Sequence, residues 1–199
     1  MTKPLDTIDE SSLEGERLEQ HYILLSVAAA LGARDNVKRH DIGKLCESMA
    51  SYGFGDPPKY DANLININNE PGALVYGNGR IAALSAMFAR GDDRPRGILQ
   101  DADGRWFVPV TFGVDSIDEA QALAFNLDHN LLTLSGSELQ NFEQARIFDD
   151  DKLMELLSER PEIKTVGFDA LDIQELFEPN STRESGSALC PECGHEFSL

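Results

Sequence analysis

Basic residues and cysteines are scarce in this chain of 199 residues. Seventeen lysines and arginines stand against 35 aspartates and glutamates, which gives a formal net charge of −18 at pH 7. Sequence-independent DNA binding depends on neutralising phosphates with Lys and Arg, so we expect no tight nonspecific binding to DNA. Three cysteines, two of them close to the C-terminus, exclude a disulfide framework and favour a reducing, cytoplasmic setting.

Long apolar runs are also absent from the sequence. No run approaches the roughly 20 apolar residues that a membrane-spanning helix needs, and the N-terminus lacks the basic-then-apolar pattern of a secretion signal. We therefore expect no membrane association. The hydrophobic content of 41% is sufficient for a core, and the length fits one domain of ordinary size with appendages.

The acidity of the chain lies in its flanks. Residues 1–33 carry a net charge of −4 and residues 106–199 a net charge of −14, whereas residues 34–105 contain ten acidic and ten basic residues. The middle segment can therefore form a local basic pocket for a small anion, although the whole chain repels polyanions.

A glycine-rich turn stands in this neutral segment. The apolar run Ala73–Tyr76 is typical of a buried strand, and Gly77-Asn78-Gly79-Arg80 separates it from an Ala- and Leu-rich helix. Glycines allow positive φ and close approach of a ligand, and the helix start offers unpaired N–H groups at the positive end of its dipole. With Arg80 in the first turn, the pattern indicates a phosphate or anion site. An ordinary strand–turn–helix corner, with Arg80 in solvent, is the alternative.

The remaining periodicity predicts a mixture of helices and strands. Residues 21–31 fit either a strand or a helix, because periodicity does not separate the two in a short apolar run. Asp41 is a candidate cap for the helix that follows it. Asp128 and His129 are residue types that can form an acid/base pair, but adjacent residues on a helix point in different directions, so we expect one side chain to be packed and the other exposed. The predicted strands are 64–67, 73–76 and 106–112, and the predicted helices are 42–53, 115–126, 138–158 with a break at 149–151, and a short one from 167.

One sequence motif precedes the glycine turn, and a second motif contains it. Asn36–Asp41, followed by the helix Ile42–Gly53 and by Pro57, resembles the pattern "N-P-R-x-H … S-I-x-x-x-G-x-x-x-P". Gly77–Ala83 resembles the pattern "G-x-x-R-x-x-A". Both patterns belong to the N-terminal domain of ParB proteins, in the ParB/sulfiredoxin superfamily.

Two further motifs follow in the order that this family has. Val108–Val110 and the stretch from Glu119 to Asn130 resemble "V-P-V … E-A-x-x-x-A … D-N-R", which is found in phage and mobile-element members. Gly167-Phe168-Asp169, with Leu171 nearby, is similar to their "G-F-D-x-x-x-L" segment. Each motif alone is weak, but four in the right order make the resemblance specific. It covers residues 20–178.

The resemblance implies an α+β fold, with a small mixed sheet and packed helices in residues 20–133. An acidic helical extension would follow in residues 134–178. Outside these, residues 1–19 read as an acidic arm, 179–189 as a Ser- and Gly-containing linker, and 190–199 as a separate tail.

The resemblance also implies a function. The chain would bind ATP or CTP with Mg²⁺ and act in the DNA metabolism of a phage or mobile element, with NTPase or phosphotransfer activity left open. A catalytically silent adaptor that recruits a DNA-modifying or packaging partner, and a metal-dependent nuclease, are the alternatives. No residue stands out as the catalytic base. The phosphates would bind Gly77, Asn78, Gly79 and Arg80, helped by Lys38, Arg39 and His40 from a neighbouring loop.

Departures from the family pattern narrow these expectations. Sulfiredoxins have a reactive cysteine where this chain has Asn78, and asparagine cannot form the thiolate that their chemistry requires. Partition-type ParB proteins usually have glutamate there, and they carry a helix-turn-helix region that the acidic residues 134–178 do not resemble. We therefore expect neither sulfiredoxin activity nor chromosome-partition clamping.

The C-terminal tail contains a zinc-knuckle-like pattern. Cys190 and Cys193 have the Cys-x-x-Cys spacing of a zinc half-site, followed by Gly194. Structural zinc needs four ligands, so a second copy of the tail in a homodimer, or a partner protein, would have to supply the remaining pair. The alternative is an idle tail.

Overall fold

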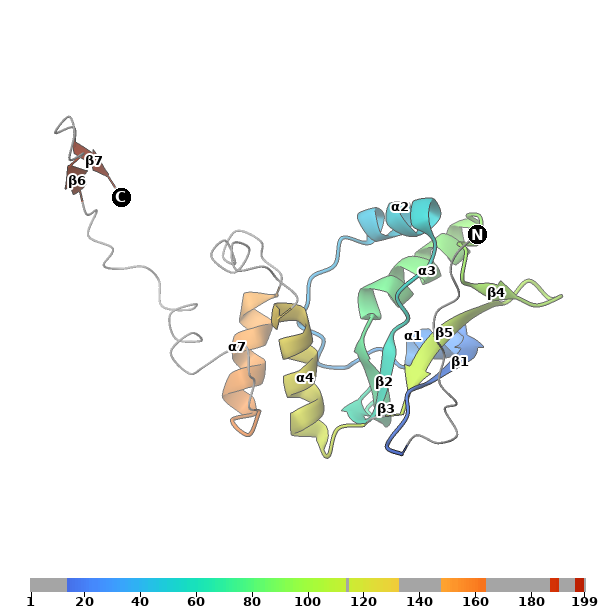
Figure 1. The fold of residues 1–199 in the computed structure, drawn as a ribbon, viewed down its shortest axis with the longest axis horizontal. Coiled ribbons are helices and arrows are strands. Elements are labelled where there is room, and N and C mark those ends of the chain that lie inside the picture. The colour runs from blue at the N-terminus through green and yellow to red at the C-terminus, as the bar shows by residue number, and fades with distance from the viewer. Residues whose placement is uncertain (1–13, 114, 133–147, 164–186, 190–195, 199) are drawn as a thin grey trace. The chain divides into compact units, whose positions relative to one another are not determined.

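A mixed β-sheet with helices packed against it forms the main part of the molecule, which is an α+β protein as predicted (Figure 1). The computed structural model describes residues 14–113, 115–132, 148–163, 187–189 and 196–198. The strand order is β1-β5-β2-β3, with β4 paired to β5; β2 and β5 run parallel and the other pairs are antiparallel. The strands are β1 (Glu19–Leu24), β2 (Lys59–Ile65), β3 (Pro71–Tyr76), β4 (Leu99–Gln100) and β5 (Trp106–Phe112).

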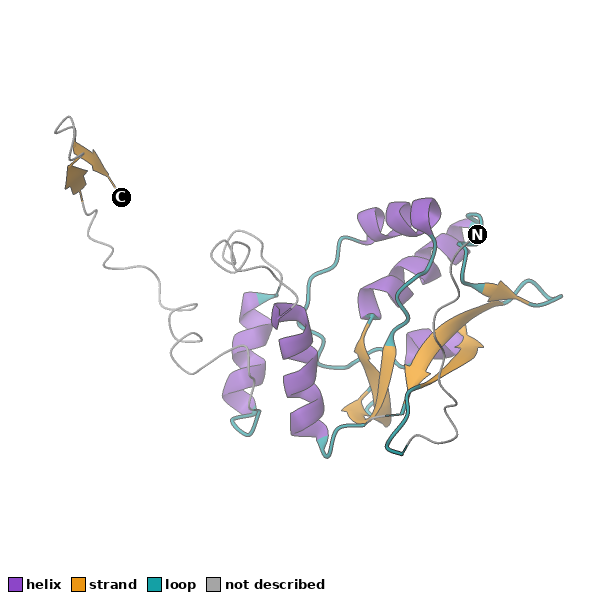
Figure 2. Ribbon diagram, in the orientation of Figure 1, coloured by secondary structure: helices purple, strands orange, loops and turns teal. Residues whose placement is uncertain are grey.

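Three helices pack together over the sheet, and a fourth lies against β2 and β3 (Figure 2). Helix α3 contacts both α1 and α2, and the shared core is built from their apolar faces and from β3 and β5. The last helix among the described residues, α7, follows Asp149, whose side chain accepts a hydrogen bond from the Lys152 N–H. The helices are α1 (Leu25–Ala30), α2 (Ile42–Tyr52), α3 (Asn78–Arg90), α4 (Glu119–Leu132) and α7 (Asp150–Glu159).

Most of the elements around the glycine turn agree with the sequence prediction. Strand β3 is buried through Ala73, Leu74 and Val75, as its continuous apolar run predicts. Helix α2 has the predicted cap, because the Asp41 carboxylate accepts a hydrogen bond from the Lys44 N–H at 3.0 Å. The strand predicted at 106–112 is confirmed as β5.

Three predicted boundaries were wrong or incomplete. The ambiguous residues 21–31 contain both alternatives, since β1 ends at Leu24 and α1 begins at the next residue. Strand β2 begins at Lys59, five residues before the predicted start, because its charged residues did not look like a strand. Helix α4 begins at Glu119, four residues after the predicted start at Asp115.

A buried carboxylate fixes the segment that leads into α4. Asp61 of β2 is fully buried and accepts hydrogen bonds from the Ser116 N–H at 2.9 Å, the Ser116 hydroxyl at 2.7 Å and the Asn63 N–H at 3.0 Å. The exposed Asp115 adds one bond, from the Ala62 N–H. These bonds hold the start of α4 against β2, and α4 carries two residues of the site below.

The chain divides into two compact units, residues 1–167 and 168–199. In the second unit, β6 (Ser187–Leu189) pairs antiparallel with β7 (Glu196–Ser198). Strand β6 therefore occupies the end of the segment expected as a linker. Cys190 and Cys193, the helix expected from Gly167, and residues 138–147 lie outside the described residues. Among the described residues, no helix has the length and apolar character needed to cross a membrane.

The Asp61 contacts predict the cost of changing this carboxylate. Asp61→Asn places an amide N–H₂ against backbone and hydroxyl donors, so we expect urea denaturation to show a loss of about 1–3 kcal/mol in the free energy of unfolding. The control is Asp115→Asn, which affects one hydrogen bond in an exposed position and should cost less than about 1 kcal/mol. Equal losses in the two variants would contradict a special role for Asp61.

Candidate functional site

The turn between β3 and α3 requires glycine at its first position. Gly77 has φ of 91°, in the left-handed region, and a Cβ added there would lie 2.5 Å from Cβ of Pro58. Helix α3 begins at the next residue, and no side chain caps its N-terminus. The first N–H groups of α3, at the positive end of its dipole, are therefore left for another acceptor.

The second glycine of the turn makes room for a histidine. A Cβ on Gly79 would lie 2.4 Å from Nδ1 of His40, so the imidazole lies directly over the first turn of α3. The side-chain oxygen Oδ1 of Asn36 accepts a hydrogen bond from the Lys38 backbone N–H at 3.4 Å, which turns the side-chain N–H₂ of Asn36 toward Nε2 of His40 at 3.3 Å. An amide N–H₂ only donates, so Nε2 accepts and the neutral ring carries its proton on Nδ1.

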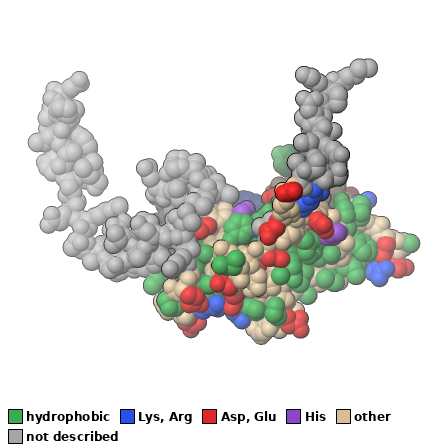
Figure 3. Space-filling model, turned by 60° about the horizontal axis from the view of Figure 1, so that its bottom comes forward, with side chains coloured by type: hydrophobic (Ala, Val, Ile, Leu, Met, Phe, Trp, Pro, Cys, Tyr) green, Lys and Arg blue, Asp and Glu red, His purple; other side chains and the backbone are tan. Residues whose placement is uncertain are grey.

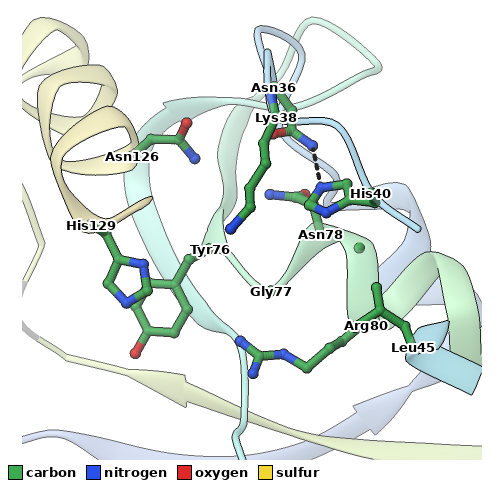
Figure 4. A pocket seen from close by; sticks show the side chains of 11 residues that line it. Asn36, Lys38, His40, Leu45, Tyr76, Gly77, Asn78, Arg80, Asn126 and His129 are labelled. Atoms are coloured by element: carbon green, nitrogen blue, oxygen red, sulfur yellow. Dashed lines mark hydrogen bonds between the residues drawn. The ribbon is translucent and has the colours of Figure 1, made fainter. Parts of the chain in front are cut away.

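Two cationic side chains enter one cavity beside this turn. The cavity, here named the Lys38–Arg80 cavity, has a volume of about 210 Å³, and Figure 4 shows the Lys38 ammonium and the Arg80 guanidinium both directed into it. The residues that line it are Asn36, Lys38, His40, Leu45, Tyr76, Gly77, Asn78, Gly79, Arg80, Asn126 and His129.

The positive charges act on each other because both groups are partly withdrawn from water. Burial, and then the neighbouring Arg80, lower the pKa of Lys38. Burial lowers the pKa of His40, with Lys38 and Arg80 adding to the effect. On the face shown in Figure 3, by contrast, Lys and Arg side chains are few and scattered among acidic and apolar ones. The cavity is thus a local positive region of a strongly acidic chain.

One nitrogen of the Arg80 guanidinium is paired with a carboxylate, and another has no hydrogen-bond partner among the described residues. Its Nη1 pairs with the carboxylate of Asp56, which lies on an exposed loop. Its Nε is buried and has no hydrogen-bond partner. An unpaired buried N–H costs about 1–3 kcal/mol, so this nitrogen is placed to receive an acceptor from outside the described residues.

A histidine of α4 faces the same cavity. The His129 ring stacks on Tyr76 with ring centres 4.1 Å apart and planes 4° apart, and it meets Phe125 edge-on. Its Nδ1 is also buried and without a partner. Burial lowers the pKa of His129, Lys38 and Arg80 lower it further, and Asp56 opposes them. Among the described residues, Arg80 Nε and His129 Nδ1 are the two buried side-chain atoms without a partner, and both belong to residues that line this cavity.

The structure brings together six of the residues predicted from sequence and leaves out one. Lys38, His40, Gly77, Asn78, Gly79 and Arg80 line the cavity, whereas Arg39 is exposed and does not. The Asn78 side chain is engaged by its own neighbours. Its side-chain oxygen accepts from the Ala33 N–H at 3.0 Å, and its N–H₂ donates to the Leu74 carbonyl at 2.9 Å.

Sequence reasoning missed the residues that α4 and β3 add. From the sequence, Tyr76 was interpreted as the end of a strand and Asn126 as the end of a helix. In the structure, the Asn126 side-chain N–H₂ donates a hydrogen bond to the Val75 carbonyl. In the sequence, His129 stood out only as a candidate acid/base partner of Asp128 and by its place in the stretch that resembles "D-N-R". One of these two residues was expected to be exposed, but both are packed: Asp128 is buried, and the half-buried His129 stacks on Tyr76 and lines the cavity.

The chain matches no family model, no curated protein and no solved structure. The resemblance to the ParB N-terminal domain therefore stays a prediction based on its four motifs. The α+β fold with its mixed sheet, and the geometry of the cavity, do not depend on that resemblance.

The contact between His40 and Gly79 predicts that a side chain at position 79 destabilises the fold. Gly79→Ala forces the imidazole away, and we expect an overpacking cost of about 1–3 kcal/mol in the free energy of unfolding, measured by urea denaturation. The control is Gly43→Ala, at the same second position of α2, where a Cβ would meet only Asp41 Oδ1 at 3.4 Å. That substitution should be neutral or stabilising by up to about 1 kcal/mol. Loss of the difference between the two would show that the ring does not lie over Gly79.

Proposed function

We propose that the Lys38–Arg80 cavity binds the phosphate groups of a nucleotide. The observation that carries the proposal is that both unpartnered buried nitrogens of the described residues, Arg80 Nε and His129 Nδ1, belong to residues that line one cavity with Lys38 and the uncapped start of α3. Buried polar atoms without partners need an explanation, and a bound anion would supply one here.

A phosphate group fits this arrangement chemically. Its oxygens would accept hydrogen bonds from the first N–H groups of α3, from Arg80 Nε–H and from His129 in its Nδ1–H tautomer. Its charge would offset the repulsion between Lys38 and Arg80, which adds to the burial that lowers the pKa of Lys38. A neutral ligand would leave that repulsion in place.

Magnesium would enter with the nucleotide. Mg²⁺ keeps several waters and binds mainly through substrate phosphates and one or two carboxylates, so it does not require an all-protein cage. Asp56, the carboxylate beside Arg80, is paired with that guanidinium, so the ion would be held mainly by the phosphates themselves. A nucleotide that arrives with Mg²⁺ would bring less net negative charge to Lys38 and Arg80 than the free nucleotide.

The biological role follows from the sequence motifs. The resemblance to phage and mobile-element members of the ParB-like family supports ATP or CTP as the nucleotide and DNA metabolism as the setting. An adaptor without nucleotide would be the alternative if the cavity binds no phosphate.

Isothermal calorimetry with ATP and with CTP, each with Mg²⁺, tests the proposal. Arg80→Ala and Lys38→Ala should each weaken binding by about tenfold or more, since each removes a charge-assisted interaction worth about 1.5–3 kcal/mol. Arg39→Ala is the matched control, because it removes the same charge from the same loop outside the cavity, and it should change the affinity less than about threefold. Absence of binding in the wild type, or equal loss in all three variants, would reject the phosphate site.

Binding should also take up protons. In the free protein, burial and the neighbouring cations hold the pKa of His40 and the pKa of His129 below the ordinary value. A bound polyanion favours the charged imidazole and raises both pKa values, so the complex binds more protons and the affinity rises as the pH falls from about 8 toward about 6.5. His129→Gln should reduce this pH dependence, whereas His21→Gln, on exposed β1, should not. An affinity that falls with decreasing pH would contradict the proposed contacts.

A further inference from the structure

A second cavity adjoins the Lys38–Arg80 cavity. It lies between the C-terminal half of α2 and the loop of residues 53–56, has a volume of about 340 Å³, and is here named the Tyr52 cavity. Leu45 and Arg80 line both cavities, so the two meet at the Arg80 side chain.

The first cavity is too small for a whole nucleotide. Its volume of about 210 Å³ is below the roughly 300–1,000 Å³ that sites for drug-sized ligands occupy. If phosphates fill it, the base and ribose must lie outside it. The Tyr52 cavity is the adjoining space.

The lining of the Tyr52 cavity differs from that of its neighbour. Met49 and Phe54 are buried and give it an apolar floor, while the Tyr52 ring is 78% exposed at its wall. Ser48 and Asp56 add a hydroxyl and a carboxylate. A flat aromatic ligand can stack on Tyr52, and a ribose hydroxyl or an exocyclic amino group can donate to Asp56.

The wall is fixed in place by Arg96. The Arg96 guanidinium donates to the Tyr52 carbonyl at 3.0 Å, and the Phe54 N–H donates to the Arg96 carbonyl at 2.7 Å. Gly53 between them has φ of 88°, and a Cβ there would lie 3.0 Å from the Arg96 carbonyl oxygen. These contacts fix the backbone of residues 52–54, which forms the Tyr52 side of the cavity.

We propose that the Tyr52 cavity binds the nucleoside end of the nucleotide whose phosphates occupy the Lys38–Arg80 cavity. This rests on the proposed function. The charges set the direction: Asp56 repels phosphate and accepts from donors, whereas Lys38 and the start of α3 attract phosphate. The ligand thus crosses Arg80 with its base against Tyr52.

The test compares ATP and CTP with inorganic tripolyphosphate, which has the phosphates and no nucleoside. Calorimetry on the wild type, Tyr52→Ala and Tyr52→Phe should show that Tyr52→Ala weakens nucleotide binding about tenfold, as expected for loss of base stacking. Its affinity for tripolyphosphate should stay within about twofold of wild type, because Tyr52 lies outside the phosphate cavity. Tyr52→Phe keeps the ring and should bind like wild type. Because Tyr52 is largely exposed, neither substitution should unfold the protein.

Asp56→Asn gives an independent readout. Removing the carboxylate frees Arg80, so tripolyphosphate should bind more tightly, by up to about fivefold for an exposed ion pair. Nucleotides should gain less or lose affinity, because the neutral amide of the variant would be a poorer acceptor for their nucleoside donors than the Asp56 carboxylate.

The outcomes separate the two proposals. If the wild type binds tripolyphosphate and nucleotides but Tyr52→Ala affects neither, or weakens both equally, the nucleoside site is overturned and the phosphate site stands. If the wild type binds tripolyphosphate as tightly as it binds ATP and CTP, the nucleoside adds nothing and the inference also fails. If the wild type binds none of the three, the proposed function itself fails.

Discussion

The close packing around the β3–α3 turn is the constraint on which the rest of the site depends. Gly77 lies against Pro58 with left-handed φ, and Gly79 lies under the His40 ring, so neither position has space for a side chain. Through these two contacts, the Pro58 end of the loop before β2 and the loop of residues 36–40 both meet the start of α3. That meeting brings Lys38 and Arg80 into one cavity, although they are 42 positions apart in the sequence.

The electrostatics of the cavity follow from the same packing. Two cations are held near each other with partial burial, which lowers the pKa of Lys38 and of the two neighbouring histidines. Asp56 compensates Arg80 on its exposed side only. A protein with net charge −18 has many carboxylates that could fill such a place. Two buried nitrogens of residues that line this cavity nevertheless have no partner among the described residues, which is the arrangement expected of a site that completes its hydrogen bonds with a ligand.

Local sequence patterns correctly predicted the elements whose structure is determined by residues close together in the sequence. The buried strand β3, the capped helix α2 and the glycine turn have signals that act over a few positions, and all three are found. Strand β2 was predicted too short, because Asp61 looks like a loop residue until Ser116, 55 positions away, supplies its hydrogen bonds. The start of α4 was misplaced for a related reason, since Asp115 bonds back to β2 and does not cap the helix.

The residues of the candidate site likewise fall into those that local motifs predicted and those that depend on distant packing. Lys38, His40 and the residues from Gly77 to Arg80 come from two short motifs, and the structure brings them together. Tyr76 and His129 could not be paired from sequence, because their stacking depends on where α4 packs against β3. Arg39 could not be separated from Lys38, since adjacent basic residues look alike until the backbone fixes which one faces the cavity.

The decisive measurement is nitrogen-15 NMR of the Arg80 and His129 side chains during a titration with ATP or CTP and Mg²⁺. We expect the Arg80 Nε and His129 Nδ1 resonances to shift and saturate together, because each nitrogen gains a phosphate oxygen as its partner. Saturable nucleotide binding with both resonances unchanged would place the ligand elsewhere and rule out the phosphate site.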